Sequence, residues 1–220
     1  MNYVIVIPNR YHDIIQPLLE SLKKYEAGAR VLIVAHEHED GYGHNVIHYP
    51  DKLKWCYAKA ANLGIEWAQK WTDKPDVVLL NDDCTLTSVL PFVQLGIQAG
   101  FVNPVGLISP LIKGCAGNRF QRWHEKPKWW RPYETMKLIW DPDTVCFPCV
   151  YIKNEAINQC GLLDEDITGY GGEDVEYCKR MRSIGWWTAV SSLVTVQHGD
   201  GSSKLNDGRG TSWSLSFARQ

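Results

Sequence analysis

The sequence has no apolar run near the roughly 20 residues needed to span a membrane. Its start is apolar but short, has no basic leader and reaches Pro8, so we expect a first strand there rather than a signal peptide. No charge sign dominates, because 23 basic and 25 acidic residues leave a formal charge of −2. That balance argues against a protein held on nucleic acid by net charge, although a local basic patch stays open. No internal repeat or linker is found, which predicts a single domain.

Cysteine occurs without a pattern typical of zinc sites. The seven cysteines are scattered and odd in number, and Cys146 and Cys149 form a C-x-x-C pair with no second pair elsewhere. A structural zinc site is therefore not expected, and no thioredoxin-like context supports a redox role. We interpret the cysteines as reduced, mostly buried thiols, which favours a cytoplasmic location.

Apolar residues make up 45% of the chain, and ten of the residues are Trp. This composition is typical of a globular protein with a substantial core. The surplus of Trp has two interpretations, packing in that core or stacking on a sugar or a base.

Segments with strand-like and helix-like patterns alternate along the first half of the chain. This order predicts an α/β fold with a mostly parallel central sheet, right-handed crossovers and helices on its faces. In such sheets ligands bind beyond the carboxyl ends of the strands. The expected strands are residues 4–7, 30–35, 46–49, 77–80, 105–112, 145–152 and 186–196. The expected helices are residues 13–25, 54–71, 91–99, 154–160 and 173–184, with a long loop or irregular hairpin at 119–140.

Three polar clusters follow expected strands or open an expected helix. Asn81, Asp82 and Asp83 directly follow an apolar strand and indicate either a turn or a site for a hard cation. Glu173 and Asp174 follow a glycine-rich turn, and they either favour the start of a helix or supply a general base. His198 follows the last expected strand and is either structural or a ligand of a metal or phosphate.

The ordered set of motifs resembles the nucleotide-sugar-dependent glycosyltransferases of the GT-A fold, in particular their inverting family 2-like group of small bacterial and phage enzymes. The resemblance covers almost the full chain, and the whole set is more specific than any one motif. The matching segments are residues 4–10 (VIVIPNR), 59–64 (KAANLG), 79–83 (LLNDD), 161–166 (GLLDED) and 171–180 (GGEDVEYCKR), followed by His198.

The resemblance implies a role for each matching residue. Asp83 and His198 would hold a divalent cation, Mn²⁺ or Mg²⁺, on the diphosphate of the donor. Asp82 would contact the ribose or a nearby water. Asp174 would be the catalytic base that takes the proton of the acceptor hydroxyl, with Glu173 supporting it.

The resemblance also implies a division of the single domain. Residues 1–100 would bind the nucleotide sugar, residues 101–198 would bind the acceptor and carry out catalysis, and residues 199–220 would form a flexible tail. The residues implied for the nucleotide pocket are Pro8, Arg10, Lys59 and Asn62.

The sequence departs from the family pattern at two places. Asn81 replaces the first aspartate of the D-x-D motif, so metal binding would rest mainly on Asp83. The family commonly has an aspartate after the second strand that reads uracil, and here His36 or Glu37 would have to replace it. A UDP-sugar is the expected donor, although this second departure leaves the base open.

The acceptor side is less defined. Asp164 belongs to the motif at residues 161–166 and is expected to contact the acceptor. Residues 119–133 interleave Arg and Lys with aromatic residues, including Trp123, Trp129 and Trp130. This stretch is either a surface loop with its Trp side chains packed inward, a platform for carbohydrate, or a surface for nucleic acid.

The expected activity is therefore transfer of a sugar from a nucleoside diphosphate sugar to an acceptor hydroxyl, with inversion. One alternative is a glycosyltransferase that modifies hydroxylated bases in phage DNA. Two alternatives of another class are a nucleotidyltransferase and a non-catalytic nucleotide-sugar-binding protein. The acidic pair at the start of the helix favours the transferase, because a nucleotidyltransferase needs no base there.

Overall fold

Alternate residues of the first strand are buried on opposite faces of a central sheet in the computed structural model of the chain. On strand β1 (Tyr3–Asn9), Val4 and Val6 face one hydrophobic core, and Ile5 and Ile7 face the other. Strands buried on both faces are typical of α/β proteins. The structure describes residues 2–36, 44–50, 54–102, 104–114, 121, 139–140, 142–167 and 172–199.

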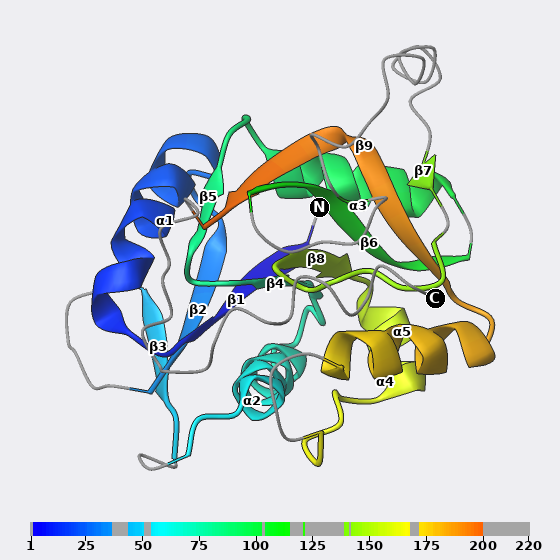
Figure 1. Cartoon of the computed structure of the whole chain (residues 1–220), viewed down its shortest axis with the longest axis horizontal. Helices are drawn as coiled ribbons and strands as arrows, with labels where there is room; N and C mark the ends of the chain where they lie inside the picture. The colour runs from blue at the N-terminus through cyan, green and yellow to red at the C-terminus, as the bar shows by residue number, and fades with distance from the viewer. Residues whose placement is uncertain are drawn as a thin grey trace.

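Five helices and nine strands form within the described residues. The helices are α1 (His12–Tyr25), α2 (Tyr57–Gln69), α3 (Pro91–Phe101), α4 (Asn154–Cys160) and α5 (Glu173–Ser183). The strands after β1 are β2 (Arg30–Ala35), β3 (Asn45–His48), β4 (Asp76–Leu80), β5 (Cys84–Leu86), β6 (Val105–Gly114), β7 (Ile139–Trp140), β8 (Cys149–Ile152) and β9 (Trp187–His198). Figure 1 shows one central sheet with helices packed against it, which confirms the predicted α/β fold class.

The sheet has the strand order β3-β2-β1-β4-β8-β6-β9-β5, and β7 pairs with β9. The first four strands run parallel, and β6 runs parallel to β9. Strand β8 is antiparallel to both of its neighbours, β4 and β6. The start of β8 therefore lies at the edge of the sheet where β4 ends.

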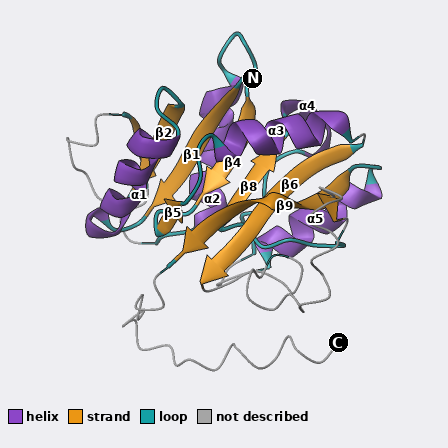
Figure 2. Cartoon of the chain, turned by 90° about the horizontal axis from the view of Figure 1, so that it is seen from above, coloured by secondary structure: helices purple, strands orange, loops and turns teal. Residues whose placement is uncertain are grey.

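Helices cover both faces of the sheet, as Figures 1 and 2 show. Helices α2, α4 and α5 pack on one face around the core that contains Val4 and Val6, and α1 and α3 cover the other. The expected helix and strand segments all form, with shifted ends. Strand β5 was not expected, since it has three residues and follows the acidic cluster directly. Residues 145–148 were expected as strand, but β8 begins only at Cys149.

The tryptophans have no common environment. Trp186 is buried in the core, whereas Trp67 and Trp187 are 48% and 43% exposed. Core packing therefore explains some of the Trp surplus and not all of it. Among the described helices, none is long and apolar enough to cross a lipid bilayer.

Candidate functional site

Strands β1, β2 and β4 end at the same edge of the sheet, because they run parallel. Their carboxyl ends carry Asn9 and Arg10, His36, and the cluster of Asn81, Asp82 and Asp83. The sequence predicted a ligand site at this edge, and the side-chain contacts there define the candidate site.

Asp82 joins the ends of two neighbouring strands. Its carboxylate accepts hydrogen bonds from Asn9 Nδ2 at 3.0 Å and from the Arg10 backbone N–H at 3.2 Å. Burial and the adjacent charge of Asp83 raise the pKa of Asp82 to about 6, although these hydrogen bonds partly oppose the shift. In the structure Asp82 therefore ties β4 to β1 at the edge of the site.

Asp83 faces the last strand instead. Its Oδ1 lies 3.0 Å from His198 Nε2, and its backbone oxygen accepts a hydrogen bond from Gly199 N–H at 2.9 Å. The pairing of β5 with β9 sets this contact, because it places Cys84 directly opposite His198. One ligand atom each from Asp83, Cys84 and His198 lies within 4.8 Å of the others, so these residues form a candidate metal centre.

The chemistry of this cluster fits a hard divalent cation. Asn81 Nδ2 lies 3.3 Å from His198 Nε2, and the buried Asn81 Oδ1 has no hydrogen-bond partner within the described part of the chain. Burial raises the pKa of Cys84 well above its usual value, so its thiol stays protonated and donates to Pro148 O at 3.2 Å. The available donors are thus carboxylate and amide oxygens with one imidazole nitrogen, a set that suits Mn²⁺ or Mg²⁺ better than a thiolate-preferring metal.

The predicted base lies in the first turn of α5. Gly172 precedes this helix with φ +110°, a conformation that glycine adopts without strain. Asp174 Oδ1 accepts hydrogen bonds from the N–H groups of Val175 at 2.7 Å and Gly172 at 3.3 Å. Burial raises the pKa values of both Asp174 and Glu173, and these N–H groups oppose the shift at Asp174. A raised pKa brings a carboxylate closer to the range that suits a general base near neutral pH.

Residues 145–148 contact both α5 and the end of β4. Val145 N–H donates to the Sγ of Cys178 on α5 at 3.5 Å, while the Pro148 carbonyl accepts from Asn81 N–H at 2.8 Å. Three residues of chain span at most about 11 Å. Helix α5, one turn after Asp174, therefore lies near the end of β4, although the two are far apart in sequence.

Tyr57, at the start of α2, contacts the same segment. Its hydroxyl donates to Phe147 O at 3.2 Å. Burial raises the pKa of Tyr57 well above its usual value, and the charges of Glu173, Asp174 and Asp82 add to the shift. The phenol of Tyr57 therefore stays neutral, and it contacts the segment that joins α5 to the end of β4.

An aromatic cluster lies beside the ends of β2 and β3. The His36 ring lies 5.5 Å from the Trp55 ring and 5.7 Å from the Tyr49 ring, and the Lys59 ammonium lies over Tyr49 at 5.8 Å. The structure thus brings two predicted nucleotide-pocket residues, His36 and Lys59, to the same aromatic group. Glu37, the alternative to His36, lies outside the described residues.

The remaining predicted nucleotide residues have separate environments. Pro8 is buried within β1, and the Arg10 guanidinium lies 4.9 Å from the centre of the Tyr11 ring. The buried Asn62 side chain holds a loop: Nδ2 donates to Leu163 O and Glu165 Oε1, and Oδ1 accepts from Leu163 N–H, each at 2.9 Å. Its polar atoms are thereby engaged with the motif at residues 161–166.

Asp164 lies in that loop. It is exposed, and its Oδ1 accepts a hydrogen bond from Asp166 N–H at 2.9 Å. The other residues predicted to bind the acceptor, Trp123, Trp129 and Trp130, lie outside the part of the chain that the structure describes.

The sequence did not single out three residues that the structure brings to this site. Tyr57 lies two positions before Lys59, so the matching helix was a signal for it. Cys146 was considered as half of a C-x-x-C pair and interpreted as a reduced, buried thiol rather than as part of this site. Gln121 lies in the basic, aromatic stretch and has no distinguishing pattern, yet it is fully buried and bonds the backbone of Cys146.

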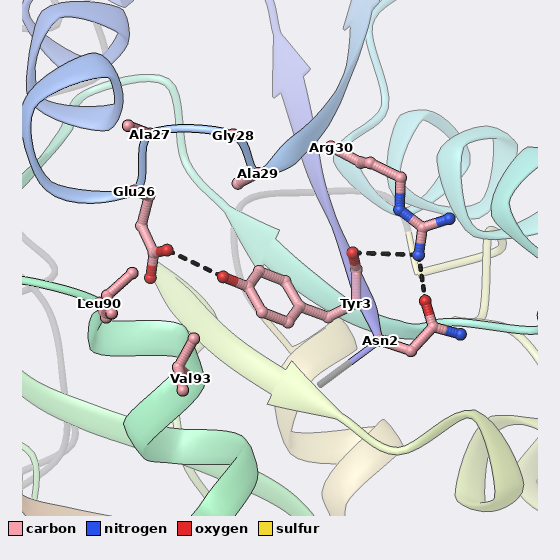
Figure 3. Close-up of a pocket in the computed structure, with 9 residues that line it drawn as sticks. All are labelled: Asn2, Tyr3, Glu26, Ala27, Gly28, Ala29, Arg30, Leu90 and Val93. Carbon is pink, nitrogen blue, oxygen red and sulfur yellow. Dashed lines mark hydrogen bonds between the residues drawn. The ribbon is translucent and has the colours of Figure 1, made fainter.

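A pocket of about 260 Å³ lies elsewhere, at the amino ends of β1 and β2 (Figure 3). Its polar groups contact one another: Tyr3 Oη donates to Glu26 Oε2 at 2.8 Å, and Arg30 bonds Asn2 and Tyr3 O. No predicted site residue lines it. Its position at the opposite ends of the strands separates it from the acidic groups.

No protein-family model and no curated protein matches the sequence. Solved structures do match the fold. GalNAc-T7, in a structure with UDP, GalNAc and Mn²⁺, aligns with a TM-score of 0.66 and 14% identity, over 91% of this chain and 45% of its own. The mannosyltransferase PcManGT from Pyrobaculum calidifontis, in complex with GDP-Man and Mn²⁺, aligns with a TM-score of 0.63 and 11% identity, over 90% of this chain and 56% of its own.

A third structure, A197 from STIV, aligns with a TM-score of 0.57 and 13% identity, over 90% of this chain and 85% of its own. The chain thus spans about half the length of GalNAc-T7 and PcManGT and most of A197. At identities this low the likeness concerns the fold. The chain has a GT-A-like glycosyltransferase fold, as its ordered motifs predicted.

Proposed function

We propose that the chain is a metal-dependent glycosyltransferase that moves a sugar from a nucleoside diphosphate sugar to an acceptor hydroxyl with inversion. The observation that carries this proposal is the bridge at residues 145–148, which contacts Cys178 on α5 on one side and Asn81 on the other. It supports a single reaction centre built from the end of β4 and the start of α5. Two structures of similar fold, which contain Mn²⁺ with UDP or GDP-Man, also support it.

Asp83 and His198 would hold the divalent cation, and the unpartnered Asn81 oxygen is a third candidate ligand. A cation bound there would stabilise negative charge on the diphosphate leaving group, an effect worth several kcal/mol. Asp82, which bonds the end of β1, would fix the strand end that presents Asp83. Since its own oxygen accepts from Arg10 N–H, it would also orient the turn expected to meet the nucleotide.

Asp174 would take the proton from the acceptor hydroxyl as that oxygen attacks the anomeric carbon. Attack on the face opposite the diphosphate inverts the configuration of the sugar. Glu173 would support the base or the acceptor. Tyr57 stays neutral, so its phenol adds no negative charge between the carboxylates.

On the donor side, Lys59 and the aromatic group of His36, Tyr49 and Trp55 form a candidate surface for the nucleotide, with Pro8 and Arg10 at the end of β1. Asn62 would act indirectly, because its amide holds the loop that carries Asp164. In this proposal residues 1–100 supply most donor contacts, and residues 101–198 supply the base. His198 comes from the second half, so the cation would join the two.

The test is turnover with Mn²⁺ and a panel of UDP- and GDP-sugars, each with and without hydroxyl acceptors. Asp174→Asn should reduce sugar transfer by about 10²–10⁴-fold, the usual contribution of a general base. Donor binding, followed as a rise in melting temperature, should stay near that of the unchanged protein. Asp143→Asn, at an exposed carboxylate, is the control. Equal turnover in Asp174→Asn would remove the assignment of the base.

A further inference from the structure

The bridge at residues 145–148 is largely buried, although it belongs to no helix or strand. Its backbone polar groups must therefore find partners outside the regular pairing of the sheet. Each of its four carbonyl groups accepts a hydrogen bond from a different part of the chain. The pairs are Cys178 Sγ to Val145 O at 3.7 Å, Gln121 Nε2 to Cys146 O at 2.8 Å, Tyr57 Oη to Phe147 O at 3.2 Å, and Asn81 N–H to Pro148 O at 2.8 Å.

Gln121 holds the bridge at Cys146 from both sides. Cys146 N–H donates to Gln121 Oε1 at 2.9 Å, and Gln121 Nε2 donates to Cys146 O at 2.8 Å and to Ser109 Oγ at 2.8 Å. Gln121 is fully buried, and its backbone oxygen accepts from Ile112 N–H on β6 at 2.6 Å. Because Ser109 and Ile112 both belong to β6, Gln121 fixes the bridge to a central strand of the sheet.

The other end of the bridge meets the candidate metal centre. Pro148 O accepts hydrogen bonds from Asn81 N–H at 2.8 Å and from the Cys84 thiol at 3.2 Å. The buried Asn81 Oδ1 has no hydrogen-bond partner among the described residues, while Asn81 Nδ2 lies 3.3 Å from His198 Nε2. Asp83 Oδ1 lies 3.0 Å from the same nitrogen. The position of the Asn81 oxygen relative to the other two candidate ligands therefore depends on where the bridge holds the end of β4.

We propose that Gln121 is a positioning residue for the metal centre, which acts through the bridge on Asn81, and that Asn81 Oδ1 is a ligand of the cation. The inference rests on the proposed function, which places a divalent cation at Asp83 and His198. A buried polar oxygen without a partner is costly, and a cation beside it would remove that cost. A hard cation such as Mg²⁺ requires its oxygen ligands close to ideal positions. Residues that orient such ligands typically contribute about 10–100-fold to the affinity for the metal.

The first experiment is a double-mutant cycle on Mn²⁺ affinity, measured by calorimetry with Mn²⁺ alone. Gln121→Met keeps the length of the side chain and removes its hydrogen bonds, so it should weaken binding about tenfold. Asn81→Ala should also weaken binding, because it removes a ligand. In the Asn81→Ala background, Gln121→Met should change the affinity by less than about twofold, since the oxygen that it positions is already missing. An equal loss in both backgrounds, or no loss in either, would overturn the proposal.

Asn62→Leu is the matched control. The Asn62 amide is buried and also holds an irregular segment, through its bonds to Leu163 and Glu165, but it contacts no candidate ligand of the cation. This variant should lose stability and keep the Mn²⁺ affinity of the unchanged protein. If Gln121→Met does not fold, Ser109→Ala takes its place in the cycle, because it removes one acceptor of the Gln121 amide. Ser109→Ala should then weaken Mn²⁺ binding only when Asn81 is present, and unaltered affinity would overturn the proposal.

The second experiment needs neither metal nor sugar. Hydrogen exchange followed by NMR reports on the Asn81 N–H group, which is bonded to Pro148 O. If Gln121 fixes the bridge, this amide should exchange several-fold faster in Gln121→Met. The His36 N–H group is the internal reference, because it also follows a strand at this edge but bonds Asn9 O at 2.9 Å. Equal acceleration of both amides would mean a general loss of stability, and it would overturn the specific link from Gln121 to Asn81.

The two experiments separate the two proposals. If the unchanged protein binds Mn²⁺ but no donor supports sugar transfer, the proposed function fails, while the double-mutant cycle still decides the role of Gln121. If the unchanged protein binds no Mn²⁺, the cation is removed from the proposed function and from this inference alike. Faster exchange confined to Asn81 would in that case still support the structural link through the bridge.

Discussion

At the scale of single residues, adjacent carboxylates in this protein have different tasks. Asp82 and Asp83 follow one another at the end of β4, yet one bonds the end of β1 and the other meets His198 on β9. The neighbouring Cys84 turns its thiol to Pro148 O. Glu26 is a buried acid far from the site. The free-energy cost of burying a carboxylate can therefore be measured at Glu26 without changing the site.

Glu26 is predicted to make stability depend on pH. It is 3% exposed and accepts hydrogen bonds from Phe92 N–H at 2.9 Å and Tyr3 Oη at 2.8 Å. Burial raises its pKa above the ordinary 4.5, although both hydrogen bonds oppose the shift. Between the unfolded and the folded pKa the folded state binds more protons, so this group lowers the free energy of unfolding as pH rises through that window.

Glu26→Gln removes the charge and keeps an oxygen that accepts from Phe92 N–H. The variant should gain stability relative to the unchanged protein above the folded pKa, and the difference should vanish below about pH 4.5. Urea unfolding at a series of pH values measures it. Glu20→Gln, at an exposed acid on α1, the helix that ends just before Glu26, is the control. If the free energies of unfolding of Glu26→Gln and of the unchanged protein differ by the same amount at every pH, this account is wrong.

At the scale of elements, helix α2 shows why one motif combines small residues with an asparagine. Ala60, Ala61 and Gly64 are buried against the sheet, while Asn62 holds the loop at residues 163–165. A Cβ at Gly64 would lie 2.2 Å from Val6 Cγ1 on β1. The close approach of α2 to β1 therefore depends on the absence of a side chain at this position.

Gly64→Ala should destabilise the protein by about 1–3 kcal/mol through overpacking. This cost exceeds the gain of up to about 1 kcal/mol that alanine brings to a helix. Gly100→Ala in α3 is the matched control, because its Cβ would meet no atom within 4 Å, and it should be neutral or slightly stabilising. Both changes can be measured by urea unfolding. A stabilised Gly64→Ala would mean that α2 moves away from β1 without cost.

The helices and longer strands could be predicted because burial on one face or both produces a recurring pattern of apolar residues in the sequence. The short strand β5 has too few residues for a period, and it follows polar residues that favour a turn. At the start of β8 the pattern misled, since Val145 and Phe147 are buried as strand residues would be but lie in an irregular segment. The same limit applies to the site. Asp83, Asp174 and His198 belong to ordered motifs, whereas the contacts of Gln121 and Cys146 arise only from tertiary packing.

At the scale of the whole molecule, the candidate metal centre depends on the pairing of a short strand from the first half of the chain with the last strand. Asn81 and His198 are 117 positions apart, and the pairing of β5 with β9 brings them together. Strand β9 also pairs with β6 and β7, so the same strand holds the second half of the sheet. The cation would therefore join residues that only the complete sheet assembles.

Asp83→Ala and His198→Ala should each weaken Mn²⁺ binding at least about tenfold, since each removes a ligand of one ion. Calorimetry with Mn²⁺ measures the affinity directly, and the rise in melting temperature with Mn²⁺ should be smaller in both variants. Asp143→Ala, at an exposed carboxylate, should bind like the unchanged protein. Unaltered Mn²⁺ affinity in either ligand variant would exclude that residue from the centre.

The long separation of Asp83 from His198 has a consequence during synthesis on the ribosome. Asp83 emerges more than 100 residues before its imidazole partner, His198. Until His198 has been made, a nascent chain lacks the second proposed ligand, so it would retain manganese less strongly than a chain that has both. Capture of the ion would thus follow the synthesis of β9.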